Sequence, residues 1–154
     1  MAAKPPAQVV VGPVLVDSGP LIALFNAADT WHAPILAWLQ ASRQARLLTT
    51  WPVATVVCAL LARRISNDAA LDFLRWVQRG GIELDTPGSA SLTEVLRISE
   101  RFSDLPFDLA DASVAEAAAR LRIRHVLTLD ADFDVYRDKA GKALVSVLRS
   151  SAAR

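Results

Sequence analysis

Residues 13–20, with the sequence PVLVDSGP, decide the fold class that we expect for this chain. The first four residues of the stretch are apolar, and the run stops at Asp17. A short continuous apolar run is typical of a central parallel strand that is covered on both faces. The Ser-Gly-Pro sequence that follows turns the chain into a short helix, which we predict at residues 21–25. A strand that passes directly into a helix indicates an α/β fold.

The same alternation of strands and helices continues along the rest of the chain. We predict the further strands at residues 46–49, 82–84, 124–128 and 143–147. We predict the further helices at residues 34–42, 52–64, from about 66 to 80, from 91 onward and at 109–121. This order implies a single α/β domain with a central parallel sheet flanked by helices. We place the domain at residues 13–150 and expect a flexible leader, which carries two prolines, at residues 1–12.

Three helix starts carry their own sequence signals. Ser66 begins a Ser-Asn-Asp run that suits an N-cap. Residues 91–94, SLTE, match a capping box, in which the first and fourth side chains bond to each other's backbone N–H groups. Asp108 lies just before the helix at residues 109–121, so we expect it to cap that helix.

The composition limits the possible functions and locations. The chain has 154 residues, of which 53% are hydrophobic and 21% charged, as in a folded domain. Its net charge is only +1, so no strong overall field draws it to nucleic acid. A single cysteine, Cys58, excludes an internal disulfide framework. The apolar run at residues 9–16 is too short and too interrupted for a membrane span, so we expect a cytoplasmic protein without a signal peptide.

Apolar side chains on the predicted helices exceed what one small core requires. Leu, Val and Trp are frequent on these helices, and we expect some of them to be buried between two copies of the chain. A two-fold dimer is the simplest arrangement that achieves this. The tryptophans are expected in the core or in such an interface: Trp31, Trp38, Trp51 and Trp76.

Four aspartates fall where an α/β fold collects its ligands. Asp17 ends the first strand, Asp111 lies in the first turn of a helix, and Asp130 and Asp132 directly follow the fourth strand. In open α/β sheets, ligands bind at the carboxyl ends of the strands, near the point where the strand order reverses. Clustered carboxylates repel one another unless a cation neutralises them, and oxygen-only ligands suit Mg²⁺ or Mn²⁺.

Each of these aspartates also has a purely structural explanation. Asp17 can start the turn that follows it. Asp111 stands where a helix N-terminus favours negative charge. Asp130 and Asp132 can be ordinary loop carboxylates. Their joint placement is what favours a metal site over four independent structural roles.

Three stretches of the sequence resemble motifs of the PIN domains, including the VapC-type toxins. These stretches are residues 14–24 (VLVDSGPLIAL), 109–113 (LADAS) and 127–133 (LTLDADF). Their order, and the separation of 19 residues between Asp111 and Asp130, also fit that family. The resemblance implies that Asp17 and Asp111 are primary metal ligands.

The resemblance also implies roles for the neighbouring residues. Asp130 would complete the acidic cluster, and Asp132 would support it or contact a second metal ion. Ser18 and Thr128 are supporting candidates, because a hydroxyl beside the cluster can bond to a metal-associated water or to a phosphate. Their simpler role, as residues of turns, remains equally open.

By the same resemblance, we expect a particular function. Such proteins cut RNA with Mg²⁺, for which Mn²⁺ can substitute, and many are toxins that a cognate antitoxin protein holds inactive. Many of them also form dimers. The resemblance therefore implies an Mg²⁺-dependent endoribonuclease, the toxin of a toxin–antitoxin pair, with RNA as substrate and no membrane association.

One stretch departs from the family pattern. Residues 49–61, TTWPVATVVCALL, resemble the family helix that supplies a glutamate, but Val56 stands at the acidic position. No Asp or Glu occurs between Asp29 and Asp68, so a shift in register does not restore the carboxylate. The missing carboxylate should weaken metal binding, so we expect either a nuclease of weakened activity that needs high Mg²⁺ or Mn²⁺, or, as a second function, a catalytically degenerate module that binds RNA or a protein partner. A flavodoxin-like response regulator is a more distant alternative, because no suitable lysine follows near the last strands.

Overall fold

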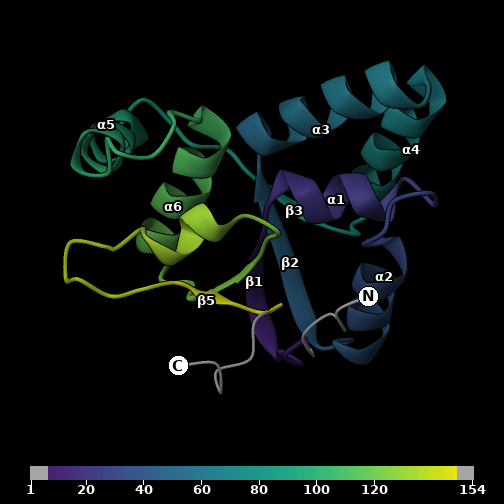
Figure 1. Cartoon of the computed structure of the whole chain (residues 1–154), viewed down its shortest axis with the longest axis horizontal. Coiled ribbons are helices and arrows are strands. Elements are labelled where there is room, and N and C mark those ends of the chain that lie inside the picture. Colours follow the sequence, from purple (N-terminus) through teal and green to yellow (C-terminus); the bar gives the residue numbers. More distant parts are fainter. Residues whose placement is uncertain (1–6, 149–154) are drawn as a thin grey trace.

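The computed structural model describes residues 7–148 of the chain and contains a five-stranded parallel sheet (Figure 1). The strand order is β3-β2-β1-β4-β5, and every neighbouring pair of strands is parallel. The strands are β1 (Gly12–Val16), β2 (Ala45–Thr50), β3 (Glu83–Asp85), β4 (His125–Leu127) and β5 (Val145–Ser146). The α/β fold with a central parallel sheet is therefore confirmed.

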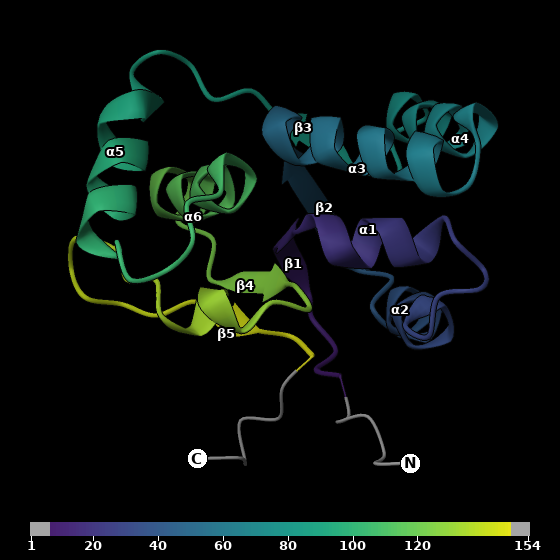
Figure 2. The ribbon, with the colours of Figure 1, turned by 45° about the horizontal axis from the view of Figure 1, so that its top comes forward.

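Six α-helices connect and cover these strands. They are α1 (Ser18–Leu24), α2 (His32–Ala41), α3 (Trp51–Arg64), α4 (Asn67–Gln78), α5 (Ser91–Arg101) and α6 (Leu109–Leu121), and a short 3₁₀ helix, η1 (Ala131–Asp134), follows β4. Figure 2 shows α1 and α2 on one side of the sheet, with α6, backed by α5, on the other. Right-handed crossovers place these helices on opposite faces of the sheet. The chain moves along the sheet in one direction from β1 to β3 and then crosses back past β1 to β4.

The sheet order places its reversal between β1 and β4. In β1, Val14, Leu15 and Val16 are each at most 1% exposed, as the continuous apolar run predicts for a covered central strand. Val16 pairs with Leu127 at the ends of the two strands. The residues that follow these strand ends, Asp17 and Thr128, therefore begin side by side at the place where α/β folds bind their ligands.

Helix α6 is the most buried helix of the domain. Residues 110–118 are all buried, and five of these nine residues are alanines. Small side chains let the helix approach the sheet closely, while α5 covers its outer side. The tight packing holds Asp111, in the first turn of α6, below the protein surface.

Two of the three expected helix caps are confirmed. The Ser66 hydroxyl accepts a hydrogen bond from the Ala69 backbone N–H at 3.1 Å. The Asp108 carboxylate accepts one from the Asp111 backbone N–H at 3.0 Å.

The expected capping box at residues 91–94 is wrong. Helix α5 has Ala90 as its N-cap, and no side chain caps it. The backbone N–H groups of Ser91 and Leu92 donate instead to carbonyls of the preceding turn, at 3.0 and 3.2 Å. The Glu94 carboxylate instead accepts hydrogen bonds from the Arg97 guanidinium, at distances down to 2.6 Å. Such a charge-assisted bond is stronger than a bond to a neutral backbone amide.

Part of the expected leader lies outside the described residues, and part of it contacts the domain. Gln8 donates from its backbone N–H to the Val147 carbonyl at 2.7 Å, and its own carbonyl accepts from the Trp38 indole at 2.8 Å. Val10 is only 3% exposed. Among residues 7–148, no helix is long and apolar enough to cross a membrane.

Candidate functional site

The carboxylate of Asp17 is held at the junction of β1 and β4. Its backbone N–H donates to the Leu127 carbonyl at 2.9 Å, which extends the sheet pairing by one residue. The Thr128 hydroxyl donates to Asp17 Oδ2 at 3.1 Å. The same hydroxyl oxygen accepts the Asp130 backbone N–H at 2.9 Å. Thr128 therefore fixes Asp17 and the start of the acidic turn at once.

One oxygen of Asp17 lacks a partner. The residue is 4% exposed, and its buried Oδ1 has no hydrogen-bond partner. Burial raises the pKa of Asp17 to about 6, against the lowering effect of hydrogen bonds from Ser18 and Thr128. The nearby carboxylates of Asp130 and Asp108 raise this pKa further. A buried carboxylate oxygen without a donor is costly unless a proton or a cation meets it.

Asp111 enters the same site from the first turn of α6. Burial raises its pKa to about 8, and the Asp17 carboxylate is the next largest cause. Asp108, Asp130 and Asp132 raise this pKa as well. The tertiary fold thus brings four other aspartates close enough to oppose the ionisation of Asp111.

Asp130 is the N-cap of η1, in the turn that follows β4, and Asp132 lies within η1. Asp130 Oδ1 accepts the Asp132 backbone N–H at 2.8 Å, which shapes this turn. One carboxylate oxygen from each of Asp111, Asp130 and Asp132 can be chosen so that all three lie within 4.8 Å of one another. Burial and the Asp130 and Asp108 charges also raise the pKa of Asp132. These three side chains are close enough to share one cation.

Asp17, Asp111 and Asp130 line an open pocket of about 390 Å³, which we call the acidic pocket, and Asp132 lies beside it, outside the lining. Its lining residues are Asp17, Ser18, Gly19, Asp108, Asp111, Leu129, Asp130 and Ala131. The lining contains four carboxylates and no basic side chain. At Gly19 the backbone approaches the Leu129 side chain closely. A Cβ at this position would lie 3.3 Å from Leu129.

The structure gives Asp108 a position that the sequence analysis did not assign. It caps α6, as expected, but its side chain also lines the acidic pocket. The signal was its spacing of three residues before Asp111, which places both carboxylates at the same helix end. Tyr136 is a second neighbour of the cluster, since burial and then the charges of Asp111 and Asp132 raise its pKa to about 12.

Val56 does not line the acidic pocket. It is half-buried on α3 and lines an adjacent pocket of about 670 Å³, which we call the apolar pocket. Asp108 lines both pockets. The apolar pocket also carries Trp51, which is 50% exposed, and Phe107, which is 73% exposed. Val56 thus faces the start of α6, on the apolar side of Asp108.

Comparison with known proteins identifies the domain. A family model described as the PIN domain matches residues 14–139.

The chain belongs to the PIN domain family.

Relatives within the PIN family carry ribonuclease and toxin names. The chain is 33% identical over 117 residues to Ribonuclease VapC26 of Mycobacterium tuberculosis, covering 76% of this chain and 86% of the relative. The crystal structure of VapC20 from Mycobacterium tuberculosis, a Sarcin-Ricin loop cleaving toxin, superposes with a TM-score of 0.73 at 21% identity. That match covers 79% of this chain and 93% of VapC20.

A complex offers a further structural comparison for this PIN domain. VapBC2 from Rickettsia felis, solved with a DNA fragment from its promoter, matches with a TM-score of 0.62 at 10% identity. It covers 87% of this chain and 96% of the matched chain. The resemblance drawn from the three sequence motifs is confirmed: the chain is a PIN domain that is similar to Ribonuclease VapC26 and shares its fold with VapC20.

Proposed function

We propose that this PIN domain is an endoribonuclease that depends on Mg²⁺, with Mn²⁺ able to substitute, and that it is the toxin of a toxin–antitoxin pair. The observation that carries the proposal is the acidic pocket at the ends of β1 and β4. The similarity to Ribonuclease VapC26 supports RNA as the substrate class. The expected location is the cytoplasm, where RNA is available.

The residues of the acidic pocket fit a hard divalent cation. All the candidate ligands are carboxylate oxygens, which Mg²⁺ and Mn²⁺ prefer. Asp17 Oδ1 is buried without a donor, and the pKa values of Asp17 and Asp111 are raised by burial and by neighbouring carboxylates. Asp111, Asp130 and Asp132, which can bring their oxygens within 4.8 Å of one another, would hold the cation, and Asp17, whose Oδ1 lacks a donor, would complete the site.

A divalent cation held there would supply Lewis-acid stabilisation of the charge that develops on a scissile phosphate. The chain's own residues position the reaction. Thr128 orients Asp17 through its hydroxyl, and Asp108 fixes the first turn of α6, on which Asp111 stands. Ser18 offers a hydroxyl at the pocket wall, where it can bond a phosphate oxygen.

A cleavage assay tests this function. Wild-type protein is incubated with a mixed RNA pool in Mg²⁺, in Mn²⁺ or in EDTA, beside the Asp111→Asn variant. We expect cleavage with either metal, none in EDTA, and a loss of activity in Asp111→Asn. Asp68→Asn, at an exposed position on α4, is the matched control and should retain activity. Metal-independent cleavage, or cleavage that Asp111→Asn retains in full, would contradict the proposal.

Val56 supports a second candidate function. If the carboxylate missing from α3 is essential, the domain is a degenerate PIN module that binds RNA or a protein without cutting. The two functions differ in one measurement, because a binding module retains RNA in Mn²⁺ and releases no fragments. Cleavage by the wild type at any metal concentration would eliminate this alternative.

The partners that we propose are a cognate antitoxin and a second copy of the chain. The structural match to the VapBC2 complex supports the antitoxin. The apolar pocket supports the homodimer, because its rim carries exposed Trp51, Leu92, Phe107 and Leu109. A contiguous exposed apolar surface of this kind marks an interaction site. Burial of this surface between two copies would also bring two acidic pockets close together, since Asp108 lines both pockets.

A further inference from the structure

A basic pocket lies at the opposite end of α6 from the acidic pocket. It has a volume of about 440 Å³ and is lined by Arg122, Arg124, Lys142 and Asp138, with alanines between them. Three cations and one carboxylate give this lining a net positive charge. By contrast, the acidic pocket is lined by four carboxylates without a cation. The two ends of α6 therefore present opposite charges.

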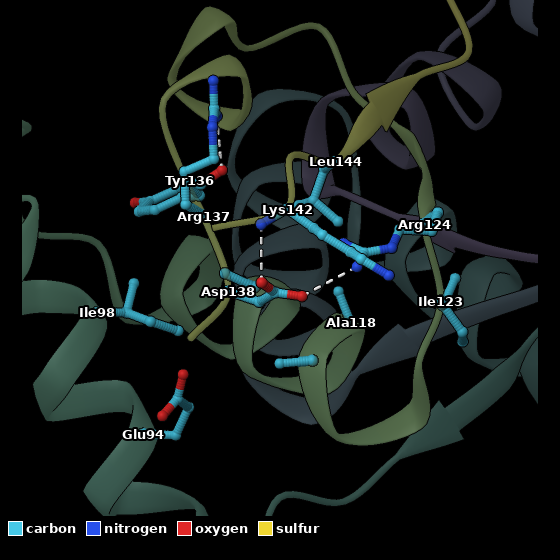
Figure 3. A pocket seen from close by; sticks show the side chains of 12 residues that line it. Glu94, Ile98, Ala118, Ile123, Arg124, Tyr136, Arg137, Asp138, Lys142 and Leu144 are labelled. Atoms are coloured by element: carbon cyan, nitrogen blue, oxygen red, sulfur yellow. Dashed lines mark hydrogen bonds and ion pairs between the residues drawn. The ribbon is translucent and has the colours of Figure 1, made fainter. Parts of the chain in front are cut away.

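The three cations come from two segments of the chain, the connection between α6 and β4 and the turn before β5. Arg122 follows the last residue of α6, Arg124 directly precedes β4, and Lys142 lies in the turn that leads to β5. Figure 3 shows the side chains of Arg124, Asp138 and Lys142 together at the adjoining pocket. The convergence depends on the tertiary fold, because 20 positions separate Arg122 from Lys142 in the sequence.

Asp138 holds the residues of this pocket in place by hydrogen bonds. Its Oδ1 accepts the backbone N–H groups of Ala140 and Lys142 at 2.9 and 2.8 Å, and its Oδ2 accepts the Arg124 guanidinium at 2.9 Å. These bonds lower the pKa of Asp138, so the group remains ionised. The carboxylate neutralises Arg124, and its bonds define the turn. In residues 7–148, neither Arg122 nor Lys142 takes part in an ion pair.

The backbone conformation of Arg122 indicates that its side chain has a role other than ending the helix. Its φ of 56° makes it the single non-glycine residue with a positive φ among those described. Glycine is the ordinary residue at such a position after a helix, because a Cβ is disfavoured there. A cation does favour a helix C-terminus, but Arg120 already supplies one in the last turn of α6. The fold alone therefore does not require an arginine at position 122.

An RNA-binding protein needs such a cationic site. The RNA backbone is a polyanion, and the affinity of RNA for a protein comes mainly from contacts between its phosphates and Lys or Arg side chains. The acidic pocket cannot supply these contacts. From Asp111 to Arg122 the chain advances by 122 − 111 = 11 residues, which corresponds to about 17 Å along the helix. A strand whose scissile bond lies at the acidic pocket can reach the basic pocket a few nucleotides away.

We propose that the basic pocket binds a backbone phosphate of the RNA substrate, at a distance from the bond that is cut. The inference rests on the proposed ribonuclease function and adds a substrate contact to it. Arg122 and Lys142 hold the phosphate by charge-assisted bonds, and Arg124 is fixed behind them by Asp138. The contact reads no base, so it contributes affinity and not sequence preference.

The test compares RNA binding by the wild type and by an Arg122→Ala, Lys142→Ala double variant. Binding of a long single-stranded RNA is measured by fluorescence anisotropy in EDTA, over a series of salt concentrations. The loss of two phosphate contacts should weaken binding and reduce the slope of log affinity against log salt by about 1.4. The matched control is Arg43→Ala, Arg79→Ala, which removes the same charge at exposed positions of another region. A double variant that behaves like this control would overturn the proposal.

A second arm separates the phosphate of RNA from free phosphate. Inorganic phosphate is titrated against both proteins while the melting temperature is recorded. One outcome is that phosphate raises the melting temperature of the wild type and not that of the double variant, while RNA affinity and its salt slope are the same in both proteins. The pocket then binds free phosphate, and the RNA contact is refuted. A reduced salt slope in the double variant supports the RNA contact.

Because binding is measured in EDTA, its result is independent of catalysis. A wild type that cleaves RNA, with no difference between the double variant and the control, would refute the basic pocket and leave the nuclease in place. A wild type that fails to cleave, with a reduced salt slope in the double variant, would refute the nuclease and leave the phosphate site in place.

Discussion

The Thr128 hydroxyl donates a hydrogen bond of 3.1 Å to the carboxylate of Asp17, although 111 residues separate them in the sequence. The contact exists because β1 and β4 are neighbours in the sheet and end together. The other oxygen of this carboxylate, Oδ1, is buried and accepts no hydrogen bond within residues 7–148. The bond also lowers the pKa of Asp17 against the effect of burial. Thr128 therefore helps to keep Asp17 ionised.

Thr128→Val should weaken metal binding, mainly near neutral pH. The variant keeps the shape of the side chain and removes the donor, so the pKa of Asp17 should rise further above its present value of about 6. Protons would then compete better with Mn²⁺. Calorimetric titration should show a loss of affinity at pH 7 that shrinks as the pH is raised. Thr128→Ser, which retains the hydroxyl, is the control, and an equal loss in both variants would contradict this role.

Without metal, the fold should lose stability as the pH rises. The pKa values of Asp17 and Asp111, about 6 and about 8, both exceed the ordinary value of 3.8. Groups with raised pKa values in the folded state contribute stability that is complete below the unfolded pKa and is lost as the pH passes through the folded pKa. The free energy of unfolding in EDTA should therefore fall between about pH 4 and about pH 8.

The Asp111→Asn variant should isolate this effect. It removes the group with the larger shift, so the decline in stability should become shallower, especially above pH 6, and Asp17→Asn should blunt it as well. Urea denaturation of the three proteins across this pH range is the measurement. In the wild type, Mn²⁺ should raise the melting temperature, and more so at high pH, because a cation that binds only the folded state stabilises it. Indifference of the wild type to millimolar Mn²⁺ would argue against a metal site.

Val56→Glu should increase cleavage if α3 lacks a carboxylate that the reaction uses. Val56 lines the apolar pocket beside Asp108, and glutamate is long enough to extend past the valine position toward the acidic side. An added anionic ligand should tighten Mn²⁺ binding and raise RNA cleavage by on the order of 10- to 1,000-fold.

Val56→Gln is the matched control, since it has the same length without the charge. If Val56 is only a packing residue, the carboxylate will be destabilising and will bring no gain in cleavage. Melting temperature and RNA cleavage of both variants, with and without Mn²⁺, distinguish these results. Equal activity of the Glu and Gln variants would refute the missing-ligand explanation.

Phe107→Asp should disrupt the proposed dimer. Phe107 is 73% exposed at the rim of the apolar pocket, so a charge there costs little in the monomer and much in an apolar interface. Light scattering should show a dimer for the wild type and a monomer for the variant. Leu71→Asp, at a 44% exposed position on α4, is the control and should remain dimeric. A monomeric wild type at high concentration would refute the dimer.

Arg120→Ala should destabilise the domain without acting on the acidic pocket. Arg120 bonds the buried Glu116 at 2.8 Å and also Asp85, which follows Leu84 at the end of β3, at 3.2 Å. Its loss leaves Glu116, which is 2% exposed, without its cation. Because the Arg120 side chain is 38% exposed, solvent screens part of this pair, and the loss should be about 1 to 3 kcal/mol. Glu116→Gln in the Arg120→Ala background should recover part of the loss, and a stability equal to that of the wild type would contradict this account.

Features that depend on neighbouring residues could be predicted from local sequence patterns alone. The apolar run before Asp17 determined a covered central strand, because no other element buries four consecutive apolar residues so readily. Asp108 lies three residues before Asp111, and this spacing predicts that Asp108 caps the helix. The structure confirms the hydrogen bond from the Asp111 backbone N–H to the Asp108 carboxylate. The alternation of strands and helices determined a parallel sheet. The positions of the strand ends, and hence the candidate aspartates, followed from the same local patterns.

Only the tertiary structure decided how these aspartates meet and what surrounds them. The adjacency of β1 and β4 brings Thr128 to Asp17, and no local pattern specifies which strands pair. The capping box at residues 91–94 failed for a related reason, because Arg97 and the carbonyls of the preceding turn supply better partners than the box itself. The sequence pattern placed Val56 at the position of an acidic residue, but in the packed chain Val56 lines the apolar pocket and not the acidic pocket.

The basic pocket illustrates the same division between sequence and structure. Arg122, Arg124 and Lys142 are ordinary surface cations in the sequence, and only the first two are neighbours there, in the connection between α6 and β4. Their convergence requires Asp138 to fold the turn that carries Lys142 back onto Arg124. Local preferences act over a few residues, whereas burial and charge act between segments that only the packed chain brings together.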